Sequence, residues 1–175
     1  MEVEPLKYSS LMAATPVVLV STLYGEVANV APFGMVMPVS HDPPMLALGI
    51  KESRDTFANI QDLGEFVVGV PGPEMLDQIL ITAKPFPRDI SEFKEAGLTK
   101  VESRVVRPYR IGECQTNLEC RLVWAKEAGD HHVVVGQVVA GSVRDDIYRT
   151  GTRDDLNPLY HLLDGRYAKR GPKIQ

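Results

Sequence analysis

The segment CRLVWAKEAGDHHVVVGQVVAGSVRDD, residues 120–146, contains two arms rich in β-branched residues. Between the arms lies Glu127-Ala128-Gly129-Asp130, a combination typical of the tight turn of a β-hairpin. The second arm includes VVVGQVV (133–139), which lacks the alternating polar residues of a half-exposed strand. The sequence therefore predicts a hairpin whose second strand is covered on both faces, as in a small barrel packed against helices or a second subunit.

Other apolar runs upstream of this hairpin predict further strands. The run TPVVLVSTL (15–23) is rich in β-branched residues and ends at Tyr24-Gly25-Glu26, while PMLALGI (44–50) and EFVVGV (65–70) are bounded by proline and glycine. Between the first two runs, NVAPFGMVMPVS (29–40) contains two prolines, which restrict it to an irregular or edge segment.

Helical patterns are few and short. DTFANIQDLG (55–64) places apolar residues at helical spacing and ends in a glycine, and PEMLDQILITAK (73–84) and SEFKEAGL (91–98) are the other candidates. The predicted fold class is mainly β, a β-barrel with a few short helices. The length of 175 residues, without repeats or a compositional boundary, predicts a single domain over 1–175.

Charge and hydropathy exclude several classes of function. The chain has 19 basic and 23 acidic residues, a net charge of −4 and no block of like charge, so no nucleic-acid partner is expected. The longest apolar stretches have the length of strands, and MEVEPLKYSS at the N-terminus lacks the basic and apolar regions of a signal peptide. No membrane association and a cytoplasmic location are therefore expected.

The sequence predicts neither a disulfide nor a metal site. Cys114 and Cys120 lie in a stretch that is typical of extended chain, where six residues span about 20 Å. A disulfide requires Cα atoms within about 7 Å, so free thiols are expected. The four histidines, His41, His131, His132 and His161, lack the spacing of zinc ligands.

The stretch KESRDTFANI (51–60) has two interpretations. In the first, Ser53 caps a helix, Asp55 favours its positive end, and the basic residues are solvated. In the second, the helix start binds an anion such as a phosphate, with hydroxyl and guanidinium donors from Ser53, Arg54 and Thr56. Similarly, Ala31 to Gly34 form either an ordinary turn containing proline or a flat surface whose backbone groups contact a planar ligand.

Five motifs follow one another along the chain: N-x-A-P-F, VS-x-DPP, S-R-D-T-x-x-N-I, E-F-V-V and G-D-H-x-x-x-x-G-x-V. This series, from Pro16 to about Tyr167, resembles the flavin reductase-like, flavoredoxin-type family of FMN-binding split β-barrel proteins. The resemblance implies a six-stranded antiparallel barrel with Greek-key character, a homodimer, and FMN bound without covalent attachment near the dimer interface.

The resemblance also implies roles for individual residues. Residues bordering the isoalloxazine, largely through backbone groups, would be Asn29, Ala31, Pro32, Phe33, Gly34 and Met35. The phosphate would be held by Ser53, Arg54 and Thr56, with Lys51 as a further candidate. Relatives often have a serine where this chain has Gly34-Met35, so only a backbone contact is expected there.

His131 is the candidate catalytic residue. With Asp130 it matches the G-D-H motif, which in the family lies on the side of the flavin where substrate or nicotinamide approaches. A role in proton transfer or orientation is one interpretation, and a surface residue beside a hairpin turn is the other. For Tyr160, His161 and Tyr167, packing in the core or at a dimer contact is favoured over flavin contact.

Two functions follow from the resemblance. The first is an NAD(P)H-dependent flavin or ferric reductase, with NAD(P)H as a transient co-substrate and electrons passed to free flavin, iron or a partner oxygenase. The second is a flavoredoxin-type carrier that keeps its FMN and takes electrons from another electron-transfer protein. The sequence contains no G-x-G-x-x-G fingerprint, so a nicotinamide donor would bind without a Rossmann domain.

Overall fold

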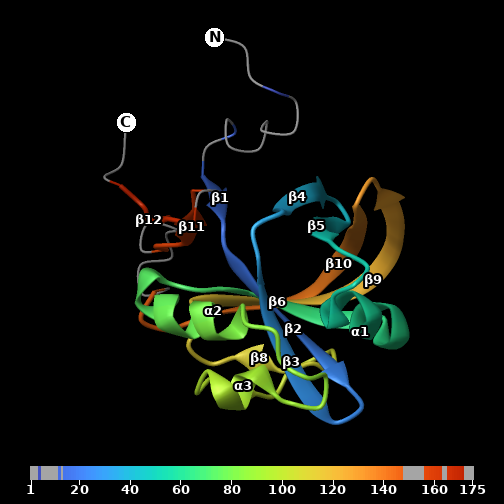
Figure 1. The fold of residues 1–175 in the computed structure, drawn as a ribbon, viewed down its shortest axis with the longest axis horizontal. Helices are drawn as coiled ribbons and strands as arrows, with labels where there is room; N and C mark the ends of the chain where they lie inside the picture. The colour runs from blue at the N-terminus through green and yellow to red at the C-terminus, as the bar shows by residue number, and fades with distance from the viewer. Residues whose placement is uncertain (1–3, 5–11, 13, 148–155, 163–164, 172–175) are drawn as a thin grey trace.

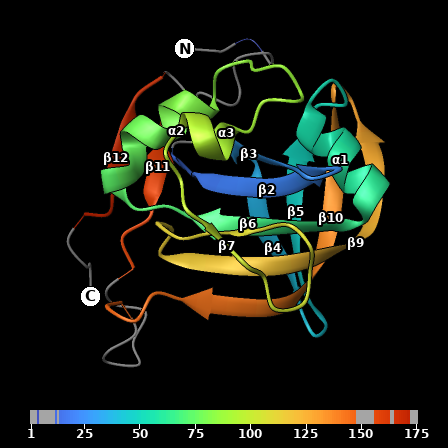
Figure 2. The same ribbon diagram turned by 90° about the horizontal axis from the view of Figure 1, so that it is seen from below.

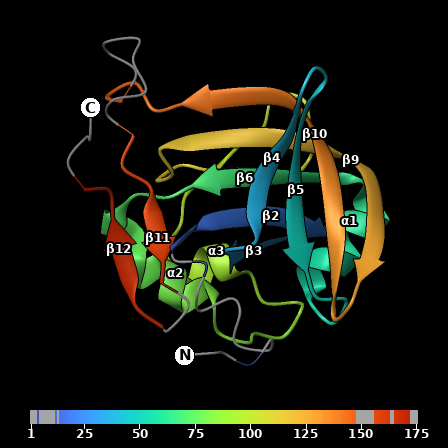
Figure 3. The ribbon, with the colours of Figure 1, turned by 90° about the horizontal axis from the view of Figure 1, so that it is seen from above.

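The computed structural model describes Glu4, Met12 and residues 14–147, 156–162 and 165–171. Its main feature is a seven-stranded antiparallel sheet with the strand order β3-β2-β6-β9-β10-β5-β4, which curves into a barrel (Figures 1 and 3). These strands are β2 (Val18–Tyr24), β3 (Val27–Phe33), β4 (Val36–His41), β5 (Pro44–Ile50), β6 (Glu65–Val70), β9 (Thr116–Ala128) and β10 (His131–Val143). The prediction of a mainly β fold is confirmed.

Two small sheets flank the main one. The first pairs β1 (Thr15–Pro16) with β11 (Leu159–His161) and β12 (Tyr167–Lys169), and the second pairs β7 (Lys100–Val101) with β8 (Arg110–Ile111). The main sheet has seven strands rather than the expected six, because the segment 29–40 is divided between two strands. Its first part completes β3, its second part forms β4, and Gly34-Met35 connects them.

The prolines of these strands lie at the sheet edges, as predicted. Strands β3, with Pro32, and β4, with Pro38, are the two edge strands of the main sheet. A proline has no N–H to donate to a neighbouring strand, so it is tolerated where one side of the strand has no partner. A register shift follows Pro38 in its pairing with β5.

The predicted hairpin is formed by β9 and β10, and Gly129-Asp130 makes its two-residue turn. Gly129 has a φ of 67°, a conformation that favours glycine. In β10, Gly136 packs so closely on β6 that an added Cβ would lie 2.3 Å from Cζ of Phe66. This contact explains the glycine of the G-D-H-x-x-x-x-G motif as a packing requirement.

Both faces of the main sheet are buried near its centre. On β2, Leu19 belongs to one apolar cluster with Ile79 and Phe93, whereas Val18 and Val20 belong to a second cluster on the opposite face. Successive side chains of a strand point to opposite faces, so burial of both faces accounts for a continuous apolar run.

The short helices lie against the main sheet (Figure 2) and contribute residues to both clusters. They are α1 (Asp55–Leu63), the 3-10 helix η2 (Pro73–Met75), α2 (Leu76–Thr82) and α3 (Glu92–Glu95). Gly64 ends α1 with a φ of 73°, as predicted. Of the two interpretations of this stretch, the one in which Ser53 caps α1 is contradicted, because Arg54 occupies the N-cap position and no side chain bonds there.

Cys114 and Cys120 are free thiols in different clusters. Cys114 precedes β9 instead of lying on it. Burial raises the pKa of the Cys120 thiol to about 12, so this thiol is protonated at neutral pH. Among the described residues, no helix has the length and apolar character that crossing a bilayer requires.

Candidate functional site

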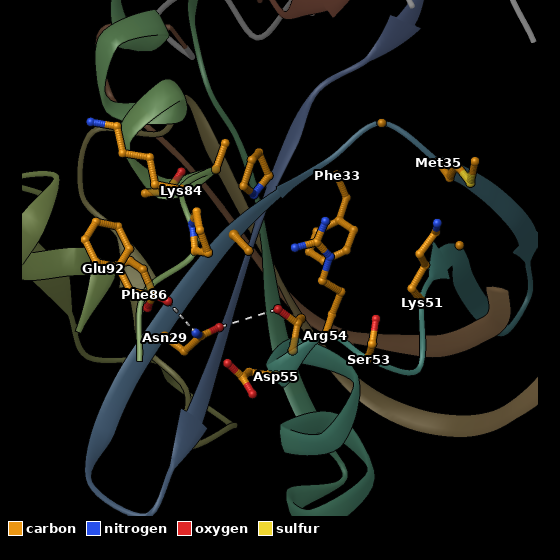
Figure 4. Close-up of a pocket in the computed structure, with 18 of the residues that line it drawn as sticks. Asn29, Phe33, Met35, Lys51, Ser53, Arg54, Asp55, Lys84, Phe86 and Glu92 are labelled. Carbon is orange, nitrogen blue, oxygen red and sulfur yellow. Dashed lines mark hydrogen bonds between the residues drawn. The ribbon is translucent and has the colours of Figure 1, made fainter. Parts of the chain in front are cut away.

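A cavity of about 450 Å³ lies between the end of β3, the start of α1 and the loop that connects α2 to α3 (Figure 4). Every residue that the sequence analysis assigned to the site lines this cavity. The set comprises Asn29, Ala31, Pro32, Phe33, Gly34, Met35, Lys51, Ser53, Arg54, Thr56 and His131. The fold thus brings together residues that are up to 102 positions apart in the sequence (131 − 29).

One wall of the cavity is formed by residues 31–35. Residues 31–35 form the end of edge strand β3 and its link to β4, so one side of this backbone is not paired with a neighbouring strand. The carbonyl of Met35 accepts a hydrogen bond of 2.8 Å from the N–H of Gly49. Side chains at this wall are apolar, and Met35 is half exposed. The arrangement suits a flat ligand whose edge hydrogen-bonds to the chain.

The start of α1 gives the cavity a positive end. No side chain caps this helix, so the N–H groups of its first residues, Asp55 and Thr56, are available to a ligand. The Arg54 side chain points into the same space (Figure 4). Within the described part of the chain, the exposed Arg54 forms no ion pair, so its guanidinium is available to an anion.

Lys51 and His131 both contact Asp130 at the mouth of the cavity. Nζ of Lys51 lies 3.3 Å from Oδ2 of Asp130, and Nδ1 of His131 lies 2.8 Å from Oδ1. The hydrogen bonds from His131 and Lys51 lower the pKa of Asp130. An ionised Asp130 accepts a hydrogen bond from Nδ1–H of His131, so Nε2 is the ring nitrogen that Asp130 does not occupy. Lys51 is thus less available to an anion than Arg54.

The floor of the cavity is a buried polar cluster, of which the sequence analysis named Asn29 and Thr56 and missed Glu92. Asn29 donates through Nδ2 to Oε1 of Glu92 at 2.9 Å, and its Oδ1 accepts from the Thr56 hydroxyl at 3.5 Å (Figure 4). Thr56 is only 2% exposed, so its hydroxyl faces the floor while its N–H belongs to the helix start. The assignment of Thr56 to a phosphate site stays a prediction, and in this structure its hydroxyl is bonded to Asn29.

The remaining wall was also missed. It comprises Thr82, Ala83, Lys84, Pro85 and Phe86, from the end of α2 and the loop that follows. Gly49 and Asp55 complete the lining. No local pattern in this loop distinguishes it from an ordinary surface connection, and its position depends on tertiary contacts of α2 and α3.

Burial raises the pKa of Glu92 above its ordinary value, and Asp55 adds to this effect. A carboxyl group with a raised pKa stabilises the fold most when it is protonated, and this contribution is lost as pH rises through the raised pKa. We expect the stability of Glu92→Gln to decline less than that of the wild type between pH 4.5 and neutral pH. Urea unfolding at several pH values measures the difference, and parallel curves would contradict the expectation.

A model of the flavin reductase like domain matches residues 10–169. The chain belongs to the flavin reductase-like family. An uncharacterized protein from Methanothermobacter thermautotrophicus is 36% identical over 175 residues, which cover 95% of this chain and 82% of that protein. The predicted family is therefore confirmed.

Solved structures show the same fold. Nitrilotriacetate monooxygenase component B from Bacillus cereus is 27% identical with a TM-score of 0.90, and the match covers 100% of this chain and 98% of that one. Flavoredoxin from Methanosarcina acetivorans is 23% identical with a TM-score of 0.87, and the match covers 100% and 93%. The predicted split-barrel fold of this flavin reductase-like chain is confirmed.

Proposed function

We propose that this protein binds FMN without covalent attachment in the cavity and is an NAD(P)H-dependent flavin or ferric reductase. The observation that carries the proposal is Arg54, which has no ion-pair partner among the described residues, beside an uncapped helix start and in the same cavity as residues 31–35. Membership of the flavin reductase-like family supports it.

The residues present fit FMN in size and chemistry. A volume of about 450 Å³ falls within the range of small-molecule sites. The flat wall suits a fused ring system, and Arg54, Ser53 and the N–H groups of Asp55 and Thr56 suit a terminal phosphate. The phosphate and the ring system would therefore be held by different elements, α1 and the β3–β4 link.

When bound, FMN supplies the capacity to accept hydride from a nicotinamide and to pass electrons to free flavin, iron or a partner oxygenase. The chain supplies position and electrostatics. Backbone groups of residues 31–35 would orient the ring edge, and Arg54 would hold the phosphate at the opposite end. The Asp130–His131 pair holds a proton at Nδ1 and keeps the imidazole at the cavity mouth, where a donor would approach.

Anaerobic titration of the FMN-loaded protein tests the proposal. Loss of flavin absorbance on addition of NADH or NADPH alone is the expected result. If neither nucleotide reduces the flavin and a reduced electron-transfer protein does, the protein is a flavoredoxin-type carrier. Failure to retain or bind FMN would overturn both functions.

His131→Ala is expected to leave FMN occupancy nearly intact and to slow flavin reduction about tenfold or more, because the imidazole that Asp130 orients for proton transfer is lost. Stopped-flow absorbance at saturating FMN measures the rate. His41→Ala is the matched control, since His41 is exposed and does not line the cavity. His132 is a poorer control, because its ring packs 4.5 Å from that of Phe57 on α1. Unchanged rates with every donor would assign His131 to the surface.

We also propose a homodimer formed through the outer face of β4, β5, β10 and β9. Met37, Ala47, Val135 and Trp124 are successive neighbours across these strands, and Met37 and Trp124 are 59% and 40% exposed. An apolar cavity of about 490 Å³, which includes Met37 and Ala47, lies on the same face. Met37 and Trp124 are the exposed ends of this row, and Ala47 and Val135 between them are buried. Exposed apolar side chains beside an apolar cavity are typical of an interface.

Sedimentation at micromolar concentration is expected to show a dimer, and Met37→Glu is expected to weaken it by about 2–4 kcal/mol, the range for a central interface residue. A carboxylate buried in an apolar interface without a partner is strongly unfavourable. Leu80→Glu is the control, because Leu80 is similarly exposed on α2. A wild-type monomer, or a dimer unaffected by Met37→Glu, would contradict the proposed interface.

A further inference from the structure

A chain of side-chain hydrogen bonds crosses the protein beneath the cavity. Nη2 of Arg88 donates to Oδ1 of Asn59 at 2.7 Å, and Nδ2 of Asn59 donates to the Thr22 hydroxyl at 3.1 Å. The Thr22 hydroxyl donates to Oδ1 of Asn29 at 3.2 Å, and Nδ2 of Asn29 donates to Glu92 at 2.9 Å. Thr22, Asn59, Asn29 and Glu92 are all at most 6% exposed.

The two ends give this chain a fixed direction. Arg88 has only donors, and both carboxyl oxygens of Glu92 accept, Oε1 from Asn29 and Oε2 from the N–H of Val30. Each amide between them must present its oxygen toward Arg88 and its nitrogen toward Glu92. The side-chain orientation of Asn29, on the cavity floor, is therefore set from both ends.

Both ends belong to one short segment of the sequence. Arg88 and Glu92 are four residues apart, directly after the cavity wall formed by residues 82–86. Arg88 also lies 3.8 Å from the centre of the Tyr24 ring and 3.6 Å from Asp62. Its remaining carboxylate neighbour is Asp55, at 3.9 Å.

Glu92 and its neighbour add contacts to β3. Oε2 of Glu92 accepts from the N–H of Val30 at 3.4 Å, and the Ser91 hydroxyl donates to the carbonyl of Ala28 at 2.6 Å. The segment 88–92 is thus attached to α1 at one end and to β3 at the other. Along the sequence, the wall of residues 82–86 therefore lies between α2 and the attached segment 88–92.

We propose that Arg88 and Glu92 are positioning residues that act as one cooperative clasp, which holds the wall of residues 82–86 against the cavity. Where it concerns bound flavin, this inference rests on the proposed function. The clasp closes through Asn59, Thr22 and Asn29, since Arg88 and Glu92 share no direct hydrogen bond or ion pair in the described structure. Loss of either end releases the wall and speeds ligand dissociation.

The competing view is that Arg88 and Glu92 are two independent local anchors. Independent contacts have additive effects, whereas members of one hydrogen-bond network do not. A double-mutant cycle of Arg88→Met and Glu92→Leu separates the two views, because each substitution removes one end of the chain and keeps an apolar stem.

The first measurement is the dissociation rate of FMN and of riboflavin, from recovery of flavin fluorescence. Each single variant is expected to dissociate about tenfold faster, as for the loss of one buried charged hydrogen bond. The double variant is expected to be no more than about twentyfold faster, instead of the hundredfold of additive effects. Both ligands are expected to respond alike, because the wall lies apart from the phosphate end.

Three variants sharpen the test. Glu92→Gln keeps an oxygen for Asn29 and is expected to dissociate within about threefold of the wild type, a rescue that loss of bulk packing would not produce. In a Thr22→Val background, which interrupts the chain, the effects of the two end substitutions are expected to become additive. Lys94→Met, an exposed change on α3, is the matched control.

A second measurement needs no ligand. Amide hydrogen exchange of residues 83–90 is expected to be about tenfold faster than in the wild type in each single variant. The double variant is expected to exchange scarcely faster than either single variant. Additive exchange and additive dissociation, or no change in the single variants, would overturn the proposal. If the wild type binds neither flavin, the proposed function fails, and the exchange measurement alone decides on the clasp.

Discussion

Replacing Glu119 with alanine is expected to lower the free energy of unfolding by about 3–5 kcal/mol, the cost of disrupting a buried charge and its partners. The Glu119 carboxylate is 1% exposed and accepts hydrogen bonds from the N–H groups of Arg104, Val105 and Val106, at 2.9, 2.7 and 3.3 Å. In the variant, these three N–H groups lose their common acceptor, and the segment 104–106 between β7 and β8 loses its attachment to β9. Guanidinium unfolding followed by Trp124 fluorescence measures the change.

Glu127→Ala is the control for this prediction. Glu127 lies on the same strand but is exposed, so its replacement is expected to change stability by less than about 0.5 kcal/mol. A loss below about 1 kcal/mol for Glu119→Ala would mean that the loop finds other partners.

Arg54→Ala is expected to weaken FMN by about 1.5–3 kcal/mol, the range for a hydrogen bond to a charged group. Riboflavin, which shares the ring system but has no phosphate, is expected to bind the variant and the wild type equally. The difference arises because Arg54 is the N-cap residue of α1 and points into the cavity without an ion-pair partner among the described residues. Quenching of flavin fluorescence on binding gives both dissociation constants.

Arg107→Ala is the control for general electrostatic attraction, since Arg107 is exposed and does not line the cavity. It is expected to leave both affinities unchanged. Equal affinity of the wild type for FMN and riboflavin would show that Ser53, Arg54 and Thr56 are only a helix start. A parallel loss of both ligands in Arg54→Ala would indicate damage to α1 instead of loss of a phosphate contact.

Strands, turns and helices were predictable where the signal is local. Gly129-Asp130 forms a turn because glycine adopts the required backbone conformation, and Gly64 ends α1 for the same reason. Pro32 and Pro38 indicated that β3 and β4 are edge strands, because a proline lacks the backbone N–H that a central strand needs. These properties depend on a few neighbouring residues and are legible in the sequence.

The cavity depends on contacts that the sequence does not show. Its backbone wall and helix start were identified through the family motifs, since local chemistry also allowed an ordinary turn and a capped helix. Glu92 was missed because it meets Asn29 from 63 positions away. The interpretation of Ser53 as N-cap was plausible because serine is a common cap, but the helix has its N-cap one residue later, at Arg54.

The link Gly34-Met35 joins the two edge strands of a single sheet, β3 and β4. A two-residue link spans only about 10 Å even when it is extended, so these edges are close only if the sheet is rolled up. The cavity wall therefore exists only in the closed barrel, and a molecule bound there is absent from any opened form. Ligand at a thousandfold excess over its dissociation constant would add about 4.1 kcal/mol against opening. Resistance of the barrel to heat or proteases therefore rises with ligand occupancy of the cavity. Depletion of the ligand in a cell would shorten the lifetime of the protein.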